Sequence, residues 1–314
     1  MNSRVHPSYK TKHQVTNWNE YERALVQRGD ITVWLSPAAI KAWNAKPSGR
    51  RGAPRKYSDL AIETALALRL VFHLPLRQTE GFLNSLFEMM RLDLSAPDHT
   101  TLSRRSKQLN VKLRRVPAKG GIHLIIDSSG LSVVGEGEWA AAKHGKRGKR
   151  GWKKLHIGVD EAGLIVAQEL TDSTGDDAST GQRLIDELKR DIKSFTGDAA
   201  YDTLAIYDSA SVRGATVVVP PSKNAIVSER MPRSPARDRT IKRINKVGRR
   251  RWKKESGYHQ QGTVENAFFR YKQIVGDRLR SRCADAQKTE AVIACNVLNR
   301  MLELGRPKSR AVAT

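Results

Sequence analysis

The fold of this chain is decided by the stretch at residues 122–127, which reads IHLIID. Its apolar run is typical of a buried strand, and the strand is expected to end in Asp127. After a Ser-Ser-Gly turn, residues 131–134 continue as a further strand. Two more apolar runs, at residues 155–159 and 164–167, are joined by Asp-Glu-Ala-Gly, which indicates a hairpin. The segment therefore predicts the first strands of a sheet.

Helical and strand patterns alternate after this hairpin. We expect a helix over about 177–193, a strand that ends at Asp198, a helix over about 203–211, and a strand over 215–219 that two prolines stop. A run of strands followed by strand-helix alternation indicates a mixed sheet with helices on its faces. The predicted fold class is therefore α/β.

Two aspartates end predicted strands, where the functional groups of α/β sheets gather. Asp127 and Asp198 hold these positions, although an aspartate after a strand is also a common turn or cap residue. Glu265 follows on a predicted helix, and the spacing of seven residues places Tyr258 and Lys272 on its face. A solvated acid is the alternative interpretation of Glu265. Three carboxylates brought together would suit divalent metal ions.

The composition indicates a polyanionic partner. Lys and Arg number 56 against 32 Asp and Glu, which gives a formal net charge of +24. Such a chain is expected to bind phosphate backbones, although a solvated basic surface is the alternative. We find no apolar signal segment and no run of about 18 apolar residues, so we expect a cytoplasmic protein without a membrane partner. Cys283 and Cys295 are too few for a disulfide framework or a four-cysteine zinc site.

The N-terminal third is predicted to contain two units. Residues 1–50 form a segment of uncertain fold, in which we expect a short strand over 31–35 and a helix over 37–43. A polar, basic linker follows at residues 46–56. It separates this segment from a small helical domain over 51–118.

The helical domain has a helix-turn-helix-like pattern. Ser58 and Asp98 are expected to cap its first and third helices, and an amphipathic helix lies between them. A three-helix packing module with a charged outer face is the alternative. In the helix-turn-helix arrangement, four residues in the first two turns of the last helix would face a DNA groove, namely Thr100, Thr101, Arg104 and Arg105.

Two basic segments lie outside the helical domain. Residues 143–154 are too rich in glycine for a helix and lack the spacing of a phosphate-binding loop. Residues 237–254 directly precede the helix that carries Glu265. We expect both segments to contact the DNA backbone, and solvated loops are the alternative. The cations expected to do so in the second segment are Arg249, Arg250, Arg251 and Lys253.

Residues 258–272, YHQQGTVENAFFRYK, resemble the Tyr-two-Arg-three-Glu-six-Lys signature of DDE transposases from bacterial insertion sequences. The nearest likeness is to the insertion-sequence five family. Residues 127–131 are similar to the first-aspartate motif of that family, and residues 197–202 to its second. The resemblance covers about residues 17–307. Gln261 departs from it, because the signature has an arginine there and a neutral amide supplies no charge for clamping DNA.

The resemblance implies a ribonuclease H-like catalytic domain over residues 119–307, with a basic insertion at about 222–257. In such a domain Asp127, Asp198 and Glu265 would bind two Mg²⁺ ions, which Mn²⁺ can replace, with Asp127 shared between the ions. The residues of the signature that are implied to contact DNA are Tyr258, His259 and Lys272.

The implied activity is that of a DNA transposase. Such an enzyme binds the terminal inverted repeats of its insertion sequence, cleaves the DNA and joins the 3′ ends to target DNA by transesterification. Pairing two ends implies a homodimer or a larger assembly on DNA. Two alternatives keep parts of this interpretation: a metal-dependent nuclease without strand transfer, and a non-catalytic DNA-binding repressor derived from a transposase.

Overall fold

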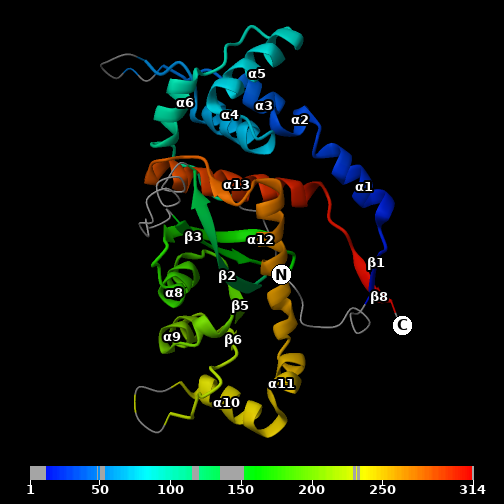
Figure 1. The fold of residues 1–314 in the computed structure, drawn as a ribbon, viewed down its shortest axis with the longest axis vertical. Coiled ribbons are helices and arrows are strands. Elements are labelled where there is room, and N and C mark those ends of the chain that lie inside the picture. Colours follow the sequence, from blue (N-terminus) through cyan, green and yellow to red (C-terminus); the bar gives the residue numbers. More distant parts are fainter. Residues whose placement is uncertain are drawn as a thin grey trace, which may run out of the picture.

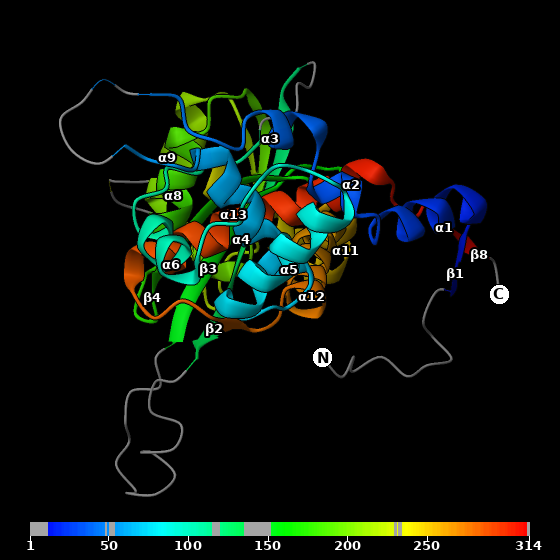
Figure 2. The ribbon, with the colours of Figure 1, turned by 90° about the horizontal axis from the view of Figure 1, so that it is seen from above.

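The computed structural model describes residues 12–47, 49, 54–114, 120–134, 152–228, 231 and 234–312. A group of helices within residues 31–106, called the helical group below, lies at one end of the molecule. A long helix, Ala284–Leu304, crosses below it, and the sheet with its flanking helices follows (Figure 1). Seen from above, the helical group covers the long helix and the sheet (Figure 2). Most of the basic segment at 143–154 lies outside the described residues.

The strands are β1 (Lys12–Val15), β2 (Ile122–Val133), β3 (Trp152–Val159), β4 (Ile165–Asp172), β5 (Ile192–Thr196), β6 (Thr216–Val218), β7 (Arg278–Leu279) and β8 (Ser309–Val312). The helices of the first half are α1 (Trp18–Gln27), α2 (Ile31–Trp34), α3 (Pro37–Lys41), α4 (Asp59–Val71), α5 (Leu76–Met89) and α6 (His99–Ser106). Those of the second half are α8 (Asp177–Glu187), η2 (Ala199–Tyr201), α9 (Leu204–Val212), α10 (Pro235–Val247), α11 (Arg249–Glu255), η3 (Tyr258–Gln261), α12 (Gly262–Ile274) and α13 (Ala284–Leu304).

The main sheet has the strand order β4-β3-β2-β5-β6, and the short β7 pairs with β2. β2, β3 and β4 are antiparallel neighbours, whereas β5 and β6 run parallel to β2. The hairpin predicted between β3 and β4 is confirmed, and Asp160 accepts hydrogen bonds from two backbone N–H groups in its loop. Three antiparallel strands followed by parallel ones is the ribonuclease H-like arrangement, which confirms the predicted mixed sheet flanked by helices.

β2 is one continuous strand of 12 residues, so the turn predicted at Ser128–Gly130 is wrong. These residues pair with β3 like the rest of the strand. Gly130 lies against the ring of Trp152, where an added Cβ would come within 3.2 Å of a ring carbon. Asp127 therefore lies in the middle of β2 and does not close a strand.

Alternating side chains of β2 enter different apolar clusters on the two faces of the sheet. Leu124 and Ile126 belong to a cluster with residues of α8 and α9. Ile125 and Leu131 belong to another cluster, which includes Phe268 of α12. Figure 1 shows α8 and α9 on one side of the sheet and α12 on the other. This period of two is the alternation expected of a buried strand.

Helices α4 to α6 lie within residues 51–118, which were predicted to be helical, and α3 lies within the helix expected over residues 37–43. Ser58 caps α4 and Asp98 caps α6 by accepting hydrogen bonds from backbone N–H groups, as predicted. The strand expected over residues 31–35 is wrong, because this segment forms α2. Asp30 caps that helix, and its carboxylate satisfies a backbone N–H in the first turn.

The helical group and the sheet share one apolar core. Leu68 of α4 and Leu102 of α6 belong to the same buried cluster as Ile157 of β3. Helix α13 connects them, because it contacts α4 and α6 as well as β4. Packing against α13 therefore fixes the helical group relative to the sheet.

Two asparagines of α13 hold the chain segments beside it. Asn299 donates to the carbonyl of Ile165 and accepts from its N–H, both at 2.8 Å, as a neighbouring strand would. Asn296 accepts from the N–H of Arg114 at 2.9 Å and donates to the carbonyl of Lys112 at 3.0 Å. Both amides are buried. They satisfy backbone groups at the edge of the sheet and in the segment that leads from the helical group.

The basic insertion forms helices α10 and α11 at the end of the molecule opposite the helical group (Figure 1). Arg237 of α10 makes a bidentate ion pair with Asp202, at 2.9 and 2.8 Å. Near the two ends of the described chain, β1 and β8 form a separate antiparallel ribbon. None of the described helices is long and apolar enough to cross a membrane.

Candidate active site

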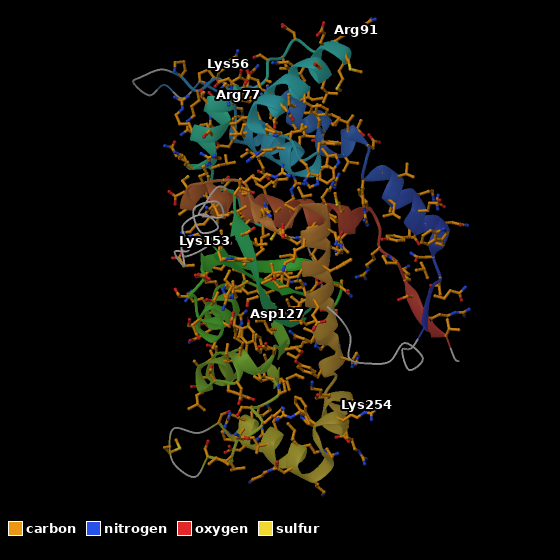
Figure 3. All side chains as sticks on the ribbon, in the orientation of Figure 1. Lys56, Arg77, Arg91, Asp127, Lys153 and Lys254 are labelled. Carbon is orange, nitrogen blue, oxygen red and sulfur yellow. The ribbon has the colours of Figure 1, made fainter. Side chains whose placement is uncertain are left out.

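Asp127 lies on the face of β2 that carries Ile125, and α12 packs against this strand. Figure 3 shows Asp127 in the middle of the molecule beside α12. Its Oδ1 accepts a hydrogen bond of 2.8 Å from the N–H of Ser128. Because β3 and β5 pair with β2 on its two sides, the backbone that carries Asp127 is held firmly.

Asp198 follows β5, the parallel neighbour of β2. The strand ends at Thr196, and Asp198 then caps η2 by accepting from the N–H of Ala200 at 2.9 Å. Gly197 allows this turn to lie against Tyr201, because an added Cβ would come within 2.8 Å of the ring. The Asp198 side chain is exposed at the edge of the sheet.

Glu265 is exposed in the first turn of α12, which begins at Gly262. The four residues before α12, residues 258–261, form the 3₁₀ helix η3, so α12 does not begin at Tyr258 as predicted. The seven-residue spacing therefore does not align Tyr258 with Glu265. Phe268 packs the helix on the sheet as expected, whereas Phe269 is 65% exposed.

The three acids lie close enough to affect one another. Burial raises the pKa of Asp127 to about 6, and the charges of Asp198 and Glu265 act in the same direction. The N–H of Ser128 opposes this rise in the pKa. Burial and the charges of the same three acids also raise the pKa of Tyr258 to about 12. A strand, a strand end and a helix thus bring the acids and one phenol together.

The acids do not form a closed metal cage. Within the described residues, no group of three His, Cys, Asp or Glu side chains is placed to hold a metal ion by itself. Asp198 and Glu265 face solvent, whereas Asp127 is partly buried. The site is therefore open to a ligand that brings further oxygen atoms.

Gln261 is buried beside the acids. Its Nε2 donates to the carbonyl of Ile126, the residue before Asp127, at 3.3 Å. Its Oε1 is buried without a hydrogen-bond partner among the described residues. The side chain thus connects η3 to β2, while the neighbouring His259 and, further along α12, Lys272 are exposed.

The residues of α6 predicted to face DNA differ in their surroundings. Thr100 and Thr101 donate their hydroxyls to Asp98 at the helix start. Arg105 turns back to α4, where its guanidinium contacts a carboxylate and a backbone carbonyl. Arg104 is exposed. Of the two arginines, only Arg104 presents its charge to solvent.

The cations predicted to bind DNA near α11 are also unequal. Arg249 donates to two carbonyls of the loop after β6, at 2.7 and 3.1 Å. Arg251 pairs with a glutamate one turn further along. Lys253 lies 4.7 Å from the ring centroid of Tyr258, and Arg250 is exposed. Arg249 thus stabilises the fold, whereas Arg250 is open to a partner.

Asp177, at the start of α8, lies with His156 on the other face of the sheet from Asp127. Its Oδ2 accepts from Lys154 at 3.0 Å, and its Oδ1 lies 3.5 Å from Nδ1 of His156. His156 is buried, hydrogen-bonded to Thr171 at 2.9 Å, and burial lowers its pKa. The charge of Asp177 also raises the pKa of Asp127. In the sequence Asp177 is indistinguishable from a residue of a helix cap.

The strand order and the placement of the acids define a ribonuclease H-like protein with an acidic site on its sheet. A family model described as a transposase DDE domain matches residues 118–300, which is more than half of the chain. A second model with the same description matches residues 26–136. The chain belongs to the transposase DDE domain family, whose members use divalent metals to cleave and transfer DNA.

Two solved transposase structures are distantly similar. The piggyBac transposase synaptic complex with hairpin DNA is 11% identical, with a TM-score of 0.36, over 94% of this chain and 78% of that one. The Mos1 transposase paired-end complex with left transposon end is 11% identical, with a TM-score of 0.25, over 75% of this chain and 83% of that one. The family assignment rests on the match to the family model.

Proposed function

We propose that the protein is a transposase of the insertion-sequence five family, which cleaves the ends of its own element and joins them to target DNA. The observation that supports this most directly is the convergence of Asp127, Asp198 and Glu265 in a chain of net charge +24. An acidic site in a basic protein suits metal-assisted chemistry on a polyanion.

The donor set fits hard divalent ions such as Mg²⁺ or Mn²⁺. Carboxylate oxygens are the ligands these ions prefer, and an open site leaves room for water and substrate phosphate. Burial, reinforced by the charges of Asp198 and Glu265, raises the pKa of Asp127, so a bound divalent ion would offset the cost of keeping this carboxylate charged. When bound, two metal ions would activate the attacking hydroxyl and stabilise the leaving 3′-oxygen. Asp127 would be the shared ligand, with Asp198 and Glu265 each on one side.

Two neighbours would position the site. Gln261 fixes η3 to the carbonyl just before Asp127 and thereby holds the helix that carries Glu265 near β2. Tyr258 remains protonated near neutral pH because its pKa is about 12, so its hydroxyl can donate a hydrogen bond to a phosphate oxygen. The amide of Gln261 thus has a positioning role in place of the DNA clamp implied by arginine in the signature.

The exposed cations near the site would contact the DNA backbone. Arg250, His259 and Lys272 are exposed on α11, η3 and α12, which succeed one another along the chain. Arg249 and Arg105 are already bonded to the protein and would act through the fold. Holding two element ends at once would require at least a dimer.

The test uses a labelled duplex that carries one end of the DNA element encoding the protein, a target plasmid and Mg²⁺. We expect the wild-type protein to cleave the 3′ end and to transfer it to the plasmid. Asp127→Ala, Asp198→Ala and Glu265→Ala should each reduce both products by more than about 1,000-fold, because each removes a metal ligand. Asp208→Ala, which removes an exposed acid of α9, is the matched control and should retain activity.

The products distinguish the transposase from its alternatives. Cleavage without transfer would identify a nuclease, and binding without metal-dependent cleavage would identify a DNA-binding protein. Activity that survives all three alanine substitutions would contradict the proposed site. Circular dichroism of each variant shows whether a loss of activity comes from unfolding.

A further inference from the structure

A basic pocket lies in the helical group, apart from the acids. It has a volume of about 790 Å³ and is formed by the end of α4, the start of α5, one face of α6 and the segment after β7. Figure 3 labels Arg77, a lining residue, at the opposite side of α13 from Asp127. No Asp or Glu is among the described residues that line the pocket. Its cations are Arg69, Arg77, Arg104, Lys107 and Arg282.

Arg69 is a buried cation with an unsatisfied donor. The residue is 8% exposed, and its Nε makes no hydrogen bond in the described part of the chain. Glu290 lies near enough for its charge to act on Arg69, while the two oxygens of that carboxylate accept from the N–H groups of Arg280 and Ser281, both at 2.8 Å. Burial lowers the pKa of Arg69, although arginine stays charged in proteins. A buried guanidinium with an unsatisfied donor is costly, and an anionic ligand beside it would offset that cost.

The start of α5 adds donors to the same pocket. This helix of 14 residues begins after Pro75, and no side chain caps it. Leu76, Arg77 and Gln78, the first three residues of the helix, line the pocket. The positive end of a helix dipole and its free N–H groups favour an anion.

The exposed face of α6 completes the pocket. Thr100, Ser103, Arg104 and Lys107 recur at helical spacing and line it, whereas Leu102 on the other face is buried in the core. The face turned toward the pocket is therefore polar and basic. Its residues overlap only partly with those predicted to read DNA, since Arg105 faces α4.

We propose that this pocket binds a phosphate of the DNA backbone, with Arg69 beneath it, the first turn of α5 at one side, and Arg77, Arg104, Lys107 and Arg282 around it. The proposal rests on the proposed transposase function, because it assigns part of the DNA to the helical group. Arg282 follows β7, which pairs with β2. A DNA strand bound in the pocket would therefore contact both the helical group and a segment joined to the catalytic sheet.

Duplex binding measured by fluorescence anisotropy over a range of salt concentrations tests the exposed cations. The double variant Arg77→Gln/Lys107→Gln should bind a labelled element end about tenfold or more weakly, and the magnitude of the slope of log K against log salt should fall by about 1, because one phosphate contact is lost. The control Arg91→Gln/Lys41→Gln removes two exposed cations from outside the pocket and should leave the slope unchanged. Equal slopes in the two double variants would overturn the proposal.

Arg69→Met separates a binding role from a structural one. If the guanidinium serves a phosphate, methionine should change the melting temperature little, because the loss of the Glu290 interaction is offset by the removal of an unsatisfied buried donor, while DNA affinity falls about tenfold. A lower melting temperature with unchanged DNA affinity would show that Arg69 serves only the fold, and would overturn the proposal.

Inorganic phosphate distinguishes DNA from a free anion as the ligand. A phosphate-induced thermal shift that Arg69→Met removes, together with unchanged DNA affinity in all pocket variants, would identify a free-anion site and contradict the proposal. The proposed function fails separately, if the wild-type protein shows neither DNA binding nor metal-dependent cleavage. Wild-type cleavage with wild-type binding by the pocket variants would refute the pocket alone.

Discussion

The acidic site and the basic pocket carry charges of opposite sign. Burial and the charges of Asp198 and Glu265 raise the pKa of Asp127 on the sheet, whereas Arg69 is buried in the helical group with an unsatisfied Nε. Asp202 and Arg237, by contrast, neutralise each other in an ion pair. A metal ion at the acids or a phosphate at Arg69 would supply the opposite charge that this pair already has within the protein.

The largest loss of stability should come from removing one partner of a buried ion pair. Asp202 is only 4% exposed and holds Arg237 through two hydrogen bonds. Arg237→Met should lower the free energy of unfolding by about 3 kcal/mol, because it leaves a buried carboxylate alone. Urea denaturation measures it. The control Arg243→Met removes an exposed pair with Glu255 and should cost less than about 1 kcal/mol. Equal losses would show that burial does not decide which charges are paired.

The next effect concerns the pH dependence of Asp127. Its pKa of about 6 in the folded protein lies above the ~3.9 of an unfolded chain, so the folded state binds the proton more tightly. The associated stability is fully present below about pH 4 and is lost as the pH rises through 6, by about 2 kcal/mol. Denaturation of the wild-type protein and of Asp127→Asn at several pH values in EDTA isolates this contribution.

Adding Mg²⁺ to the same denaturation experiment tests whether the charge of Asp127 binds a metal ion. At neutral pH, Mg²⁺ should restore stability to the wild-type protein, because binding to the folded state alone shifts unfolding. It should restore little in Asp127→Asn. Identical pH profiles for the two proteins, or an equal response to Mg²⁺, would mean that the charge of Asp127 is compensated by other groups.

The smallest effect on stability is expected at Gln261. Gln261→Met keeps the length of the side chain but removes its hydrogen bond to Ile126, which should cost about 1 kcal/mol. A positioning role predicts a further consequence: kcat for cleavage falls while DNA affinity is retained. Reduced affinity with unchanged kcat would instead favour a DNA contact for this residue. Gln261→Asn, which keeps the amide on a shorter side chain, is the matched comparison.

Sequence patterns predicted most elements of the sheet because local signals agreed with the tertiary environment there. The β3–β4 hairpin, a strand at β5 and the caps of α4 and α6 were expected and are present. The Ser-Ser-Gly segment in β2 was misassigned, because turn-forming residues became extended once β3 paired alongside them. Residues 31–35 were misassigned for the opposite reason, since the β-branched residues suggested a strand whereas the cap at Asp30 begins a helix.

The candidate site was accessible from sequence only in part. Asp127, Asp198 and Glu265 could be selected from strand patterns and a resemblance, but their mutual influence depends on pairing between β2 and β5 and on the packing of α12. That the charge of Asp177 also acts on Asp127 could not be predicted, because nothing in a helix-start aspartate reveals which strand it approaches. Lys253 and Arg249 share a basic run in the sequence, yet one covers an aromatic ring and the other bonds to a loop.

Periodicity, composition and motif spacing are local properties, so they indicated the α/β fold class, the basic character of the chain and the acids proposed to bind metal. Which charges are paired could be read only from the folded chain. Gln261 forms a buried contact with β2, Arg105 bonds to α4, and Arg69 lies at the base of a pocket. The physical reason is that burial and partner distance set the energy of a charge, and both depend on residues that are remote in the chain.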